Sequence, residues 1–518
     1  MTSIRRLLPG TIPLLIVIGL LDATYLTYEH FFGGPVVCQI GTFADCGAVL
    51  RSSYSVLFGL PVALLGMIQY LVVGGLFLLS VKLADSLYKR MLFIQTAIGL
   101  IFSLYFTFLQ FFIIRSICPY CLLSALVSAL IYIATRMHYE DEYRSFVRAK
   151  TGFVYKLFGK PFLFLIPADT IHDIAMTLGR ISGSSRLIRW FFARAFVYKN
   201  PALKVKIGKM TMHNPVGLSA GYDYTGSFVH ILPSIGFGFQ TVGTISAKPC
   251  AGNDAPRLGR LLKSRSLLVN KGFRNPGADA IISRLEKQSF AYPLGISVGR
   301  TNDETTLDLP SAIKDIVAGF HAFEDSKVRH SYYELNISCP NLKGSLSLYP
   351  PENLKKLLDA LTKLKITKPV FVKMPIEKSD AEVRAMLAVI AKYKWITGVI
   401  FGNLQKDRKD PAFVKEEITT AGKGHFSGKP TFMRSNQLIK LAYQEYGTRF
   451  VIVGCGGIFS AEDAYRKIRS GATLLQMITG MIFEGPQRIA EINEGLAQLL
   501  SQDGYTHISE AVGADISS

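Results

Sequence analysis

Seven cysteines are spread unevenly along this 518-residue chain. Four of them fall within the first 121 residues, just outside long apolar runs: Cys38, Cys46, Cys118 and Cys121. Thiol pairs can form and break disulfides, and the thiolate is the form that reacts. The placement predicts disulfide chemistry at one face of a membrane, with electrons passing to a molecule dissolved in the lipid.

Cys118 and Cys121 form a Cys-x-x-Cys motif that opens the last of these apolar runs. At a helix start, this spacing favours a thiolate on one cysteine and permits a reversible disulfide. Zinc binding is the alternative, because Cys38 and Cys46 would complete a set of four thiolates. Since closed zinc sites usually combine two short-spaced pairs, and these pairs lie in separate loops, redox chemistry is favoured.

The elements that position these thiols are four apolar stretches, each near the ~20 residues needed to cross a bilayer. They run over about 11–32, 56–81, 91–114 and 119–135. The first is interpreted as a retained helix rather than a signal peptide, because no small-residue cleavage site follows it. The sequence predicts four transmembrane helices.

The basic residues around these stretches predict their orientation. Most of them precede the first stretch, separate the second from the third, or follow the fourth: Arg5, Arg6, Lys82, Lys89, Arg90, Arg136, Arg144, Arg148 and Lys150. By the positive-inside rule, both termini are cytoplasmic and the four N-terminal cysteines face outward. A multi-pass protein of a bacterial inner membrane would thereby hold its thiols on the oxidising side.

Several short motifs of this part resemble the vitamin K epoxide reductase family over residues 10–135. They are Cys38, Asp45-Cys46, Ser52, Ser53-Tyr54, Phe58-Gly59-Leu60-Pro61, Gly66, Tyr70 and the Cys118/Cys121 pair. The resemblance implies an all-α four-helix bundle that binds a quinone beside Cys118 and Cys121, with Ser52 near its headgroup. It also implies that Cys38 and Cys46 shuttle electrons from an exported thioredoxin-like partner, so that disulfides form while the quinone is reduced.

Asp22 interrupts the first apolar stretch, where an ionisable group is costly and usually has a reason. Two roles remain open. The carboxyl could act near the quinone, or it could hydrogen-bond Thr24, Tyr25 or a neighbouring helix.

The composition changes near residue 140, which divides the chain into a membrane domain over 1–140, a linker over 141–213 and a globular domain over 214–518. Residues 151–213 hold ten lysines and arginines against two aspartates, interleaved with aromatic clusters. This favours an amphipathic helical element on an anionic lipid surface, with a solvated basic linker as the alternative. Without a nucleic-acid motif, the net charge of +20 does not indicate nucleic-acid binding.

In the last 300 or so residues, short apolar runs alternate with helical segments, which is typical of an α/β fold with a parallel sheet. Eight strands are expected, at 215–220, 237–244, 294–298, 332–337, 369–374, 397–401, 450–454 and 473–477. Eight such units predict a TIM (β/α)8 barrel, whose active site lies at the C-terminal ends of the strands.

Polar motifs follow several of these strands. Asn336-Ile337-Ser338-Cys339-Pro340-Asn341 places two amides and a thiol at one rim position, where amides can hold a planar heterocycle and a cysteine can act as a base. Lys373 ends the fifth strand, where a cation could stabilise negative charge on a reduced flavin ring. Ser427-Gly428 and Gly454-Cys455-Gly456-Gly457 provide backbone amides that can wrap a phosphate.

Together these motifs resemble the dihydroorotate dehydrogenase family over about residues 155–515. The resemblance implies an FMN enzyme that oxidises the small molecule dihydroorotate to orotate and, in the membrane class, passes the electrons to quinone through a helical extension, here 155–195. Cys339 matches the base. Asn336, Asn341 and Asn403 match substrate contacts. The positions that match flavin contacts are Ser219, Ala220, Thr244, Asn336, Lys373, Gly428, Gly457 and Thr479.

The chain departs from this family on the substrate side. Tyr224 stands where the family has a lysine that contacts the flavin and the substrate carboxylate, and Ser297 replaces an asparagine. The spacing in Val269-Asn270-Lys271 is one residue shorter than is usual in the family. Lys271 could therefore supply the positive charge that is missing at Tyr224. The membrane class generally has serine at the base position, where this chain has Cys339.

The leading hypothesis is a bifunctional membrane oxidoreductase whose two halves both reduce quinone. Two alternatives concern the barrel. It could be an FMN protein for a different substrate, or a catalytically silent anchor for the thiol-oxidising half.

Overall fold

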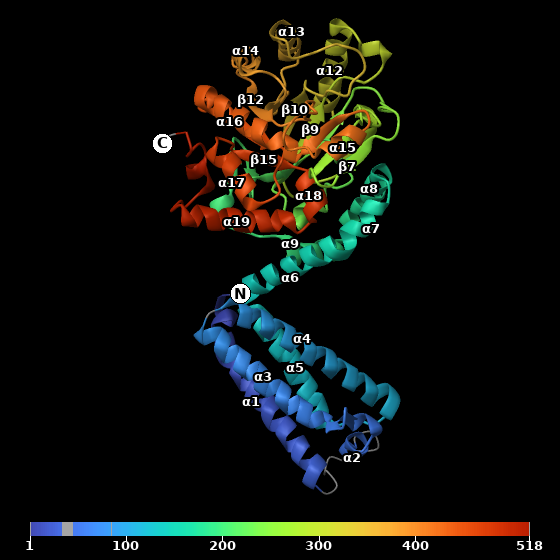
Figure 1. The fold of residues 1–518 in the computed structure, drawn as a ribbon, viewed down its shortest axis with the longest axis vertical. Coiled ribbons are helices and arrows are strands. Elements are labelled where there is room, and N and C mark those ends of the chain that lie inside the picture. Colours follow the sequence, from blue (N-terminus) through green and yellow to red (C-terminus); the bar gives the residue numbers. More distant parts are fainter. Residues whose placement is uncertain (1, 34–44, 84, 517–518) are drawn as a thin grey trace. The chain divides into compact units, whose positions relative to one another are not determined.

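The structure is a computed structural model and describes residues 2–33, 45–83 and 85–516. The chain divides into two compact units, Met1–Val147 and Arg148–Ser518 (Figure 1).

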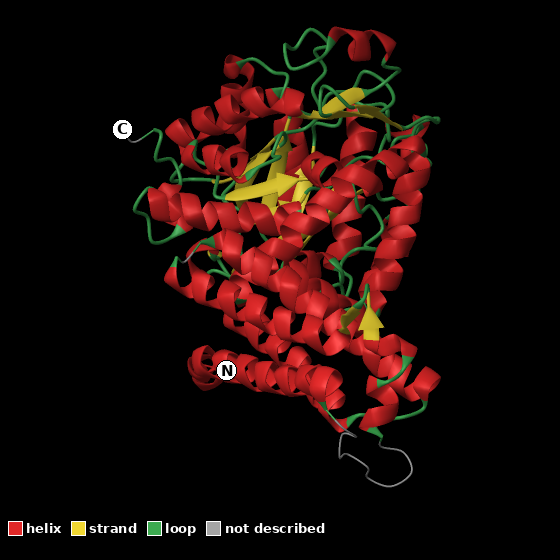
Figure 2. Cartoon of the chain, turned by 60° about the horizontal axis from the view of Figure 1, so that its bottom comes forward, coloured by secondary structure: helices red, strands yellow, loops and turns green. Residues whose placement is uncertain are grey.

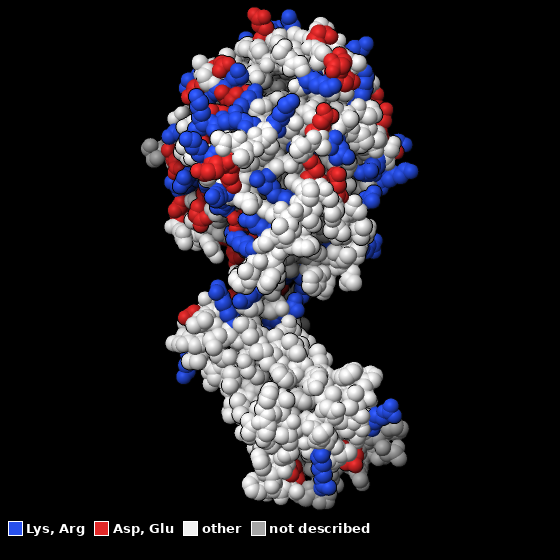
Figure 3. Space-filling model, turned by 45° about the vertical axis from the view of Figure 1, so that its right-hand side comes forward, with Lys and Arg blue, Asp and Glu red and all other residues white. Residues whose placement is uncertain are grey.

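The first unit is built on four long helices: α1 (Thr2–Phe32), α3 (Val62–Lys82), α4 (Ser86–Phe108) and α5 (Pro119–His138). Helix α4 continues through a π-helical turn, η2 (Leu109–Ile114). Within the described residues, four helices are long and apolar enough to cross a membrane, which agrees with the four predicted spans. Their outward surface is almost free of charged side chains (Figure 3), as contact with lipid requires.

The four helices form a bundle in which α1 packs against α3 and α5, and α4 packs against α3 and α5. Its core contains buried apolar side chains from every helix, including Ile12, Val73, Leu92 and Ile131. Cys118, the residue before α5, is buried in a separate small cluster with Cys46 and Val49.

The second predicted helix begins six residues later than expected. Residues 53–61 form a 3-10 turn, η1 (Ser53–Ser55), and a tight antiparallel hairpin of β1 (Val56–Leu57) and β2 (Leu60–Pro61). Gly59 has a φ of +82°, which glycine adopts at little cost, and Pro61 has no N–H to donate within a helix. Together with the short helix α2 (Cys46–Leu50), this hairpin lies in the connection that leads from α1 to α3.

The segment between the bundle and the barrel is helical as far as residue 196. It comprises α6 (Glu140–Val154), the π-helical turn η3 (Tyr155–Gly159), α7 (Lys160–Leu165), α8 (Ala168–Ser184) and α9 (Arg186–Phe196). The chain bends by 116° before α8, because Ile166 precedes a proline and takes an extended conformation. Helix α9 exposes large apolar side chains beside its basic residues, and Leu187 is 73% exposed.

The second unit contains a closed barrel of eight parallel strands, with helices on its outside (Figure 2). In their order around the barrel, the strands are β5 (Val216–Leu218), β6 (Phe239–Ile245), β9 (Leu294–Val298), β10 (Tyr332–Asn336), β11 (Val370–Met374), β12 (Ile396–Phe401), β14 (Val451–Cys455) and β15 (Leu474–Met477). All eight coincide with predicted strands, and the TIM barrel is confirmed.

The helices of this unit include α10 (Leu232–Ile235), α11 (Ala278–Leu285), α12 (Leu309–Glu324), α13 (Pro351–Thr362), α14 (Asp380–Ile390), α15 (Lys415–Thr420), α16 (Phe432–Tyr446), α17 (Ala461–Arg469), α18 (Thr479–Glu484) and α19 (Arg488–Gln502). Strand residues and the inner faces of these helices form one continuous apolar core. This core fixes the strand ends that carry the polar motifs.

Two smaller sheets accompany the barrel and were not predicted. One is a hairpin of β3 (Val205–Ile207) and β4 (Met210–Met212). The other has three antiparallel strands, β7 (Leu258–Leu261), β8 (Ser266–Val269) and β13 (His425–Gly428), with β8 in the middle. In this sheet His425 pairs with Val269, so the loop after β8, which carries Lys271, lies beside the residues that lead into β13.

Candidate redox sites

The Cys-x-x-Cys motif lies at the start of α5, as the sequence predicts. Cys118 is the N-cap residue, its sulfur accepts a hydrogen bond from the Cys121 N–H at 3.4 Å, and its own N–H donates to Gln110 Oε1 at 2.9 Å. The hydrogen bond with the Cys121 side chain lowers the pKa of the Cys118 thiol below its ordinary value. This cysteine is therefore the one poised to form a thiolate.

The described N-terminal cysteines differ in oxidation state. Cys118 and Cys121 are free thiols, whereas Cys46 is disulfide-bonded, and Cys38 lies outside the described residues. Cys46, Val49 and Cys118 form a small buried cluster, against which Cys121 packs. Cys46 is thus close to the Cys-x-x-Cys motif, as disulfide exchange between the pairs requires.

This neighbourhood does not support the zinc alternative, because a cysteine in a disulfide has no thiolate to offer a metal. Within residues 2–33, 45–83 and 85–516, no group of three or more His, Cys, Asp or Glu side chains could hold a metal ion.

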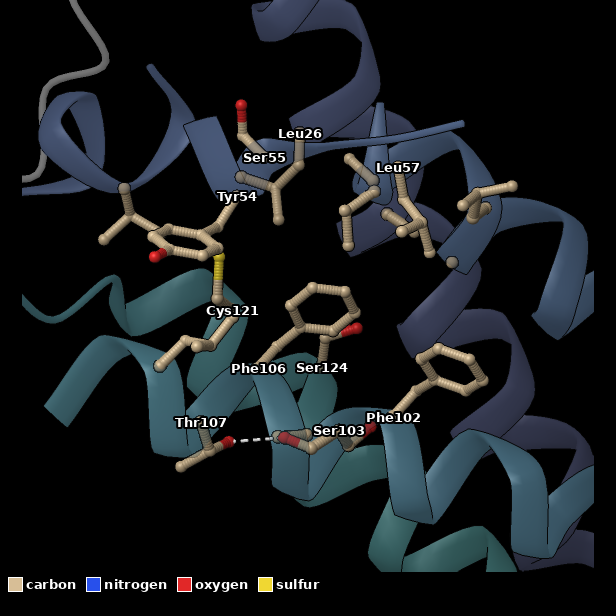
Figure 4. Close-up of a pocket in the computed structure, with 18 of the residues that line it drawn as sticks. Leu26, Tyr54, Ser55, Leu57, Phe102, Ser103, Phe106, Thr107, Cys121 and Ser124 are labelled. Carbon is tan, nitrogen blue, oxygen red and sulfur yellow. Dashed lines mark hydrogen bonds between the residues drawn. The ribbon is translucent and has the colours of Figure 1, made fainter. Parts of the chain in front are cut away.

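A cavity of about 440 Å³ opens beside Cys121 (Figure 4). Its wall includes apolar side chains from α1, α3 and α4, and the sulfur of Cys121 points toward the ring of Tyr54. The wall also includes Ser52, whose hydroxyl donates to the Val49 carbonyl at 2.8 Å and so also closes the turn after α2. A cavity whose wall combines apolar side chains with hydroxyl and amide groups suits a lipid-soluble ligand that carries polar atoms.

The barrel has its own cavity, of about 160 Å³, at the C-terminal ends of the strands. Eight of its wall residues are predicted site residues or belong to the predicted motifs: Ala220, Thr244, Asn336, Cys339, Asn341, Lys373, Asn403 and Ser427. The strand-end motifs, which are far apart in the sequence, therefore meet at one place.

Other predicted residues lie next to this cavity and hold its walls. Ser219 is buried and accepts a hydrogen bond from Lys373 Nζ at 3.1 Å. Thr479 and Ser427 share a hydrogen bond of 2.8 Å between their hydroxyls. Gly428 and Gly457 have φ values of +87° and +72°. A Cβ atom at Gly428 would lie 2.4 Å from the Arg265 carbonyl oxygen, and one at Gly457 would lie 2.5 Å from Phe432 Cβ.

The amides of the fourth-strand motif take part in two short networks. Asn336 Nδ2 donates to Thr244 Oγ1 at 2.8 Å, and Thr244 in turn contacts Ser297 Oγ at 2.9 Å. Ser297 is fully buried behind Thr244, so that this departure from the family pattern changes what supports the wall. Asn341 Nδ2 donates to the Val269 carbonyl at 2.9 Å, which ties the motif to the loop after β8.

Cys339 lies beside this wall and is partly exposed. Burial of its sulfur raises the pKa of the thiol to about 11, although Lys373 opposes this shift. In this environment the side chain is a neutral thiol at pH 7, and the corresponding thiolate is a strong base.

The position of the missing lysine is filled by an aromatic cluster. Tyr224 stacks on His172 of α8, with ring centroids 5.5 Å apart, and Lys271 Nζ lies 4.6 Å from the Tyr224 ring centroid and 3.1 Å from His172 Nε2. All three side chains line the cavity. Burial lowers the pKa of Lys271 to about 7, so its charge depends on pH near neutrality.

Two details of this corner differ from what the sequence suggested. Asn270 accepts a hydrogen bond from Asn253 at 2.9 Å, while its neighbours Val269 and Lys271 line the cavity. His172 was missed, because it comes from the helical extension, 99 residues before Lys271, and belongs to no motif.

The residues of the barrel cavity fit an FMN group. A flavin ring needs polar contacts at its edge and a cation that favours its reduced form, and Asn336, Thr244 and Lys373 have this chemistry. A phosphate needs closely approached backbone, which the positive-φ glycines Gly428 and Gly457 permit.

Comparisons with known proteins agree with this division into two sites. Residues 202–500 match the family described as "Dihydroorotate dehydrogenase", and residues 11–135 match the "Vitamin K epoxide reductase family". A Sulfurovum protein named "Dihydroorotate dehydrogenase (quinone)" is 36% identical over 357 residues, which cover 69% of this chain and 97% of that protein. A Trichodesmium erythraeum protein of the same name is 35% identical over 337 residues, covering 63% of this chain and 87% of that protein.

Solved structures give the same result for the barrel. The ligand-free DHODH of Eimeria tenella matches with a TM-score of 0.58 and 27% identity, over 67% of this chain and 98% of that one. The same enzyme in complex with ferulenol matches with a TM-score of 0.55 and 27% identity, over 64% of this chain and 94% of that one. The chain therefore belongs to the dihydroorotate dehydrogenase family and carries, ahead of its barrel, a domain that matches the vitamin K epoxide reductase family.

Proposed function

We propose that this protein is a bifunctional membrane oxidoreductase whose two halves both reduce quinone. One half oxidises thiols, and the other oxidises dihydroorotate. The observation that carries the proposal is that each half has a cavity in which redox groups of its family come together, Cys121 in the bundle and Lys373 with Cys339 in the barrel.

In the bundle, an exported thioredoxin-like dithiol reduces the disulfide of Cys38 and Cys46. Disulfide exchange then passes the electrons to Cys118 and Cys121, whose dithiol reduces a quinone beside Cys121. Cys46 in a disulfide next to free Cys118 and Cys121 is consistent with the stage after this exchange, before the dithiol of Cys118 and Cys121 reduces the quinone. The proposed setting is a bacterial inner membrane, with these cysteines facing outward and the barrel in the cytoplasm.

In the barrel, bound FMN would supply the two-electron chemistry that links oxidation of the substrate to reduction of quinone. Its proposed contacts are Ser219, Ala220, Thr244, Asn336, Lys373, Gly428, Gly457 and Thr479. Asn336, Asn341 and Asn403 hold the substrate through their amides, and the Cys339 thiolate takes the proton that leaves as the dihydro ring becomes orotate.

Lys271 supplies the cation for the substrate carboxylate, in place of the family lysine whose position Tyr224 occupies. The amine lies in the same cavity as Asn341 and Cys339, and His172 and Tyr224 hold it there. A carboxylate brought beside this amine would favour its charged form.

A different substrate is the second candidate, and Tyr224 and Ser297 favour it. An aromatic ring at a carboxylate-binding position suits an uncharged cyclic molecule better than an anion. In that case the barrel would still hold FMN. A catalytically silent barrel is a third possibility.

One experiment separates these candidates. The full chain is purified in detergent, loaded with FMN and mixed anaerobically with dihydroorotate. We expect the yellow colour to bleach and to return on addition of a soluble quinone. A yellow protein that dihydroorotate leaves unbleached would support a different substrate, and a protein that takes up no FMN would support the silent anchor.

A further inference from the structure

Asp22 is a buried carboxyl within the apolar span Leu8–Phe32 of α1. Its side chain is 8% exposed, and within the described residues neither carboxylate oxygen makes a hydrogen bond of normal geometry. An ionisable group inside a membrane is expensive and commonly marks a functional path.

The groups that face Asp22 belong to the thiol site. Its polar neighbour is the hydroxyl of Ser124, which follows Cys121 by three residues on α5. The carboxyl also interacts electrostatically with Cys118 and Cys121 at the start of α5 and with Tyr70 on α3. These are the titratable groups that the two helices packed against α1 present to it.

Hydroxyl groups connect this carboxyl to the cavity. Tyr70 Oη lies 3.0 Å from Ser124 Oγ and 3.1 Å from Ser128 Oγ, and it also contacts the Ser124 carbonyl at 2.9 Å. Tyr70, Ser124 and Ser128 line the cavity together with Cys121, and Figure 4 shows Ser124 on the same helix as Cys121. Hydroxyls both donate and accept, so such a chain can pass a proton.

A purely structural role for Asp22 finds little support in the hydrogen bonds of α1. The neighbouring Thr24 and Thr27 hydroxyls donate to the carbonyls of Leu20 and Ala23 at 2.7 Å and 2.6 Å, within their own helix. They therefore do not satisfy the carboxyl.

We propose that Asp22 is the proton-transfer group of the thiol–quinone reaction. It accepts the proton that a thiol of the Cys118/Cys121 pair loses, and returns it through Ser124 and Tyr70 to an oxygen of the reduced quinone. This inference rests on the proposed function of the bundle.

The reaction balances without another reactant. Two S–H bonds break and one S–S bond forms between Cys118 and Cys121, which are oxidised by two electrons. The quinone takes these two electrons and two protons and becomes the hydroquinone. Asp22 gains and loses one proton, and is unchanged over the cycle.

The test separates the quinone step from disulfide exchange. The full chain is reduced, mixed with a soluble quinone, and the rate at which Cys118 and Cys121 are oxidised is followed by rapid alkylation. We expect Asp22→Asn to slow this step by about 100-fold, the lower end of what general acid–base catalysis contributes. Asp22→Glu should recover most of the rate, and Glu29→Gln, another carboxylate of α1, should leave it unchanged.

A second readout excludes a general loss of structure. Exchange between an added dithiol, Cys46 and the Cys118/Cys121 pair needs no quinone, so Asp22→Asn should perform it at the rate of the unchanged protein. The rate of quinone reduction should also lose one titration step from its pH profile in Asp22→Asn and keep it in Asp22→Glu. A merely structural role would slow exchange as well.

Variants of the hydroxyl chain keep the proposal testable if Asp22→Asn does not fold. Ser124→Ala and Tyr70→Phe should each slow quinone reduction by about 10-fold or more. Thr96→Val removes a buried hydroxyl of α4 that bonds within its own helix, and should have no effect.

The outcomes distinguish this inference from the function on which it rests. If quinone does not oxidise Cys118 and Cys121 in the protein without substitutions, the proposed function of the bundle is overturned. If the protein without substitutions is active and the Asp22→Asn, Ser124→Ala and Tyr70→Phe variants all reduce quinone within threefold of its rate, the role of Asp22 alone is overturned.

Discussion

Cys339 is the residue on which the chemistry of the barrel depends. Because burial raises the pKa of its thiol to about 11, the reactive thiolate is a minor form at pH 7, and its population grows tenfold with each pH unit below that value. The rate of flavin reduction by dihydroorotate should therefore rise with pH between about 7 and 10. Stopped-flow absorbance of the FMN-loaded protein measures this rate.

Replacement of Cys339 gives the matching mutant prediction. The Cys339→Ala variant should still bind FMN. Dihydroorotate should reduce this FMN at least 100-fold more slowly, because the base is lost. Cys339→Ser, which restores an ionisable hydroxyl, should recover part of the rate. Equal rates in Cys339→Ala and the unchanged protein would remove Cys339 from the mechanism.

Lys271 predicts a pH dependence of the opposite sign for substrate binding. Its pKa is lowered to about 7, so the cation is present below that pH and is lost above it. The Kd for dihydroorotate should therefore increase as the pH rises from 6 to 8.5. Lys271→Met should raise the Kd about 10-fold at pH 6, with little effect at pH 8.5, as measured by equilibrium titration.

The control for this prediction is Lys343→Met, which removes a lysine whose amine pairs with Glu304 at the surface. An unchanged Kd at pH 6 in Lys271→Met would show that this amine does not anchor the carboxylate. The different-substrate candidate would then gain support.

The sequence could predict those site residues that stand in a local motif at a strand end. Asn336, Cys339 and Lys373 are of this kind, and the structure brings them to one cavity. It could not predict His172, whose place beside Lys271 depends on how a separate helix packs.

At the scale of elements, the start of α5 presents both reactive thiols and lies beside the cavity. Its Cys118 N–H is buried and bonded to Gln110, so the helix start is held in place. Cys118→Ala and Cys121→Ala should each abolish quinone-linked disulfide formation, because one thiol cannot form the disulfide. Orotate formation by the same preparations serves as the internal control and should be unchanged. Activity retained in both variants would refute the assignment.

The eight barrel strands were predictable because each is a short buried apolar run that ends in polar or glycine-rich sequence. The sheet of β7, β8 and β13 was not, since β8 pairs with β13 about 160 residues further along the chain. Nor was the β1–β2 hairpin, which lies inside an apolar run that composition alone assigns to a helix. Long-range pairing and local turn chemistry decided these cases.

At the scale of the whole molecule, one chain joins two units that share an electron acceptor in the proposed function. If both draw on the same quinone, they compete when it is scarce. In anaerobic vesicles with less quinone than substrate, added dihydroorotate should reduce the yield of disulfides, and an excess of quinone should restore it. Independence at limiting quinone would indicate separate acceptors.

The most direct test of the account counts electrons that reach quinone from each half of the same protein. The full chain in lipid nanodiscs, loaded with FMN and kept anaerobic, is given a dithiol or dihydroorotate, and the hydroquinone formed is quantified. We predict one hydroquinone per disulfide and one per orotate, with Cys118→Ala losing only the first and Cys339→Ala strongly slowing only the second. Hydroquinone formed from neither substrate, or from only one of them, would contradict the central claim.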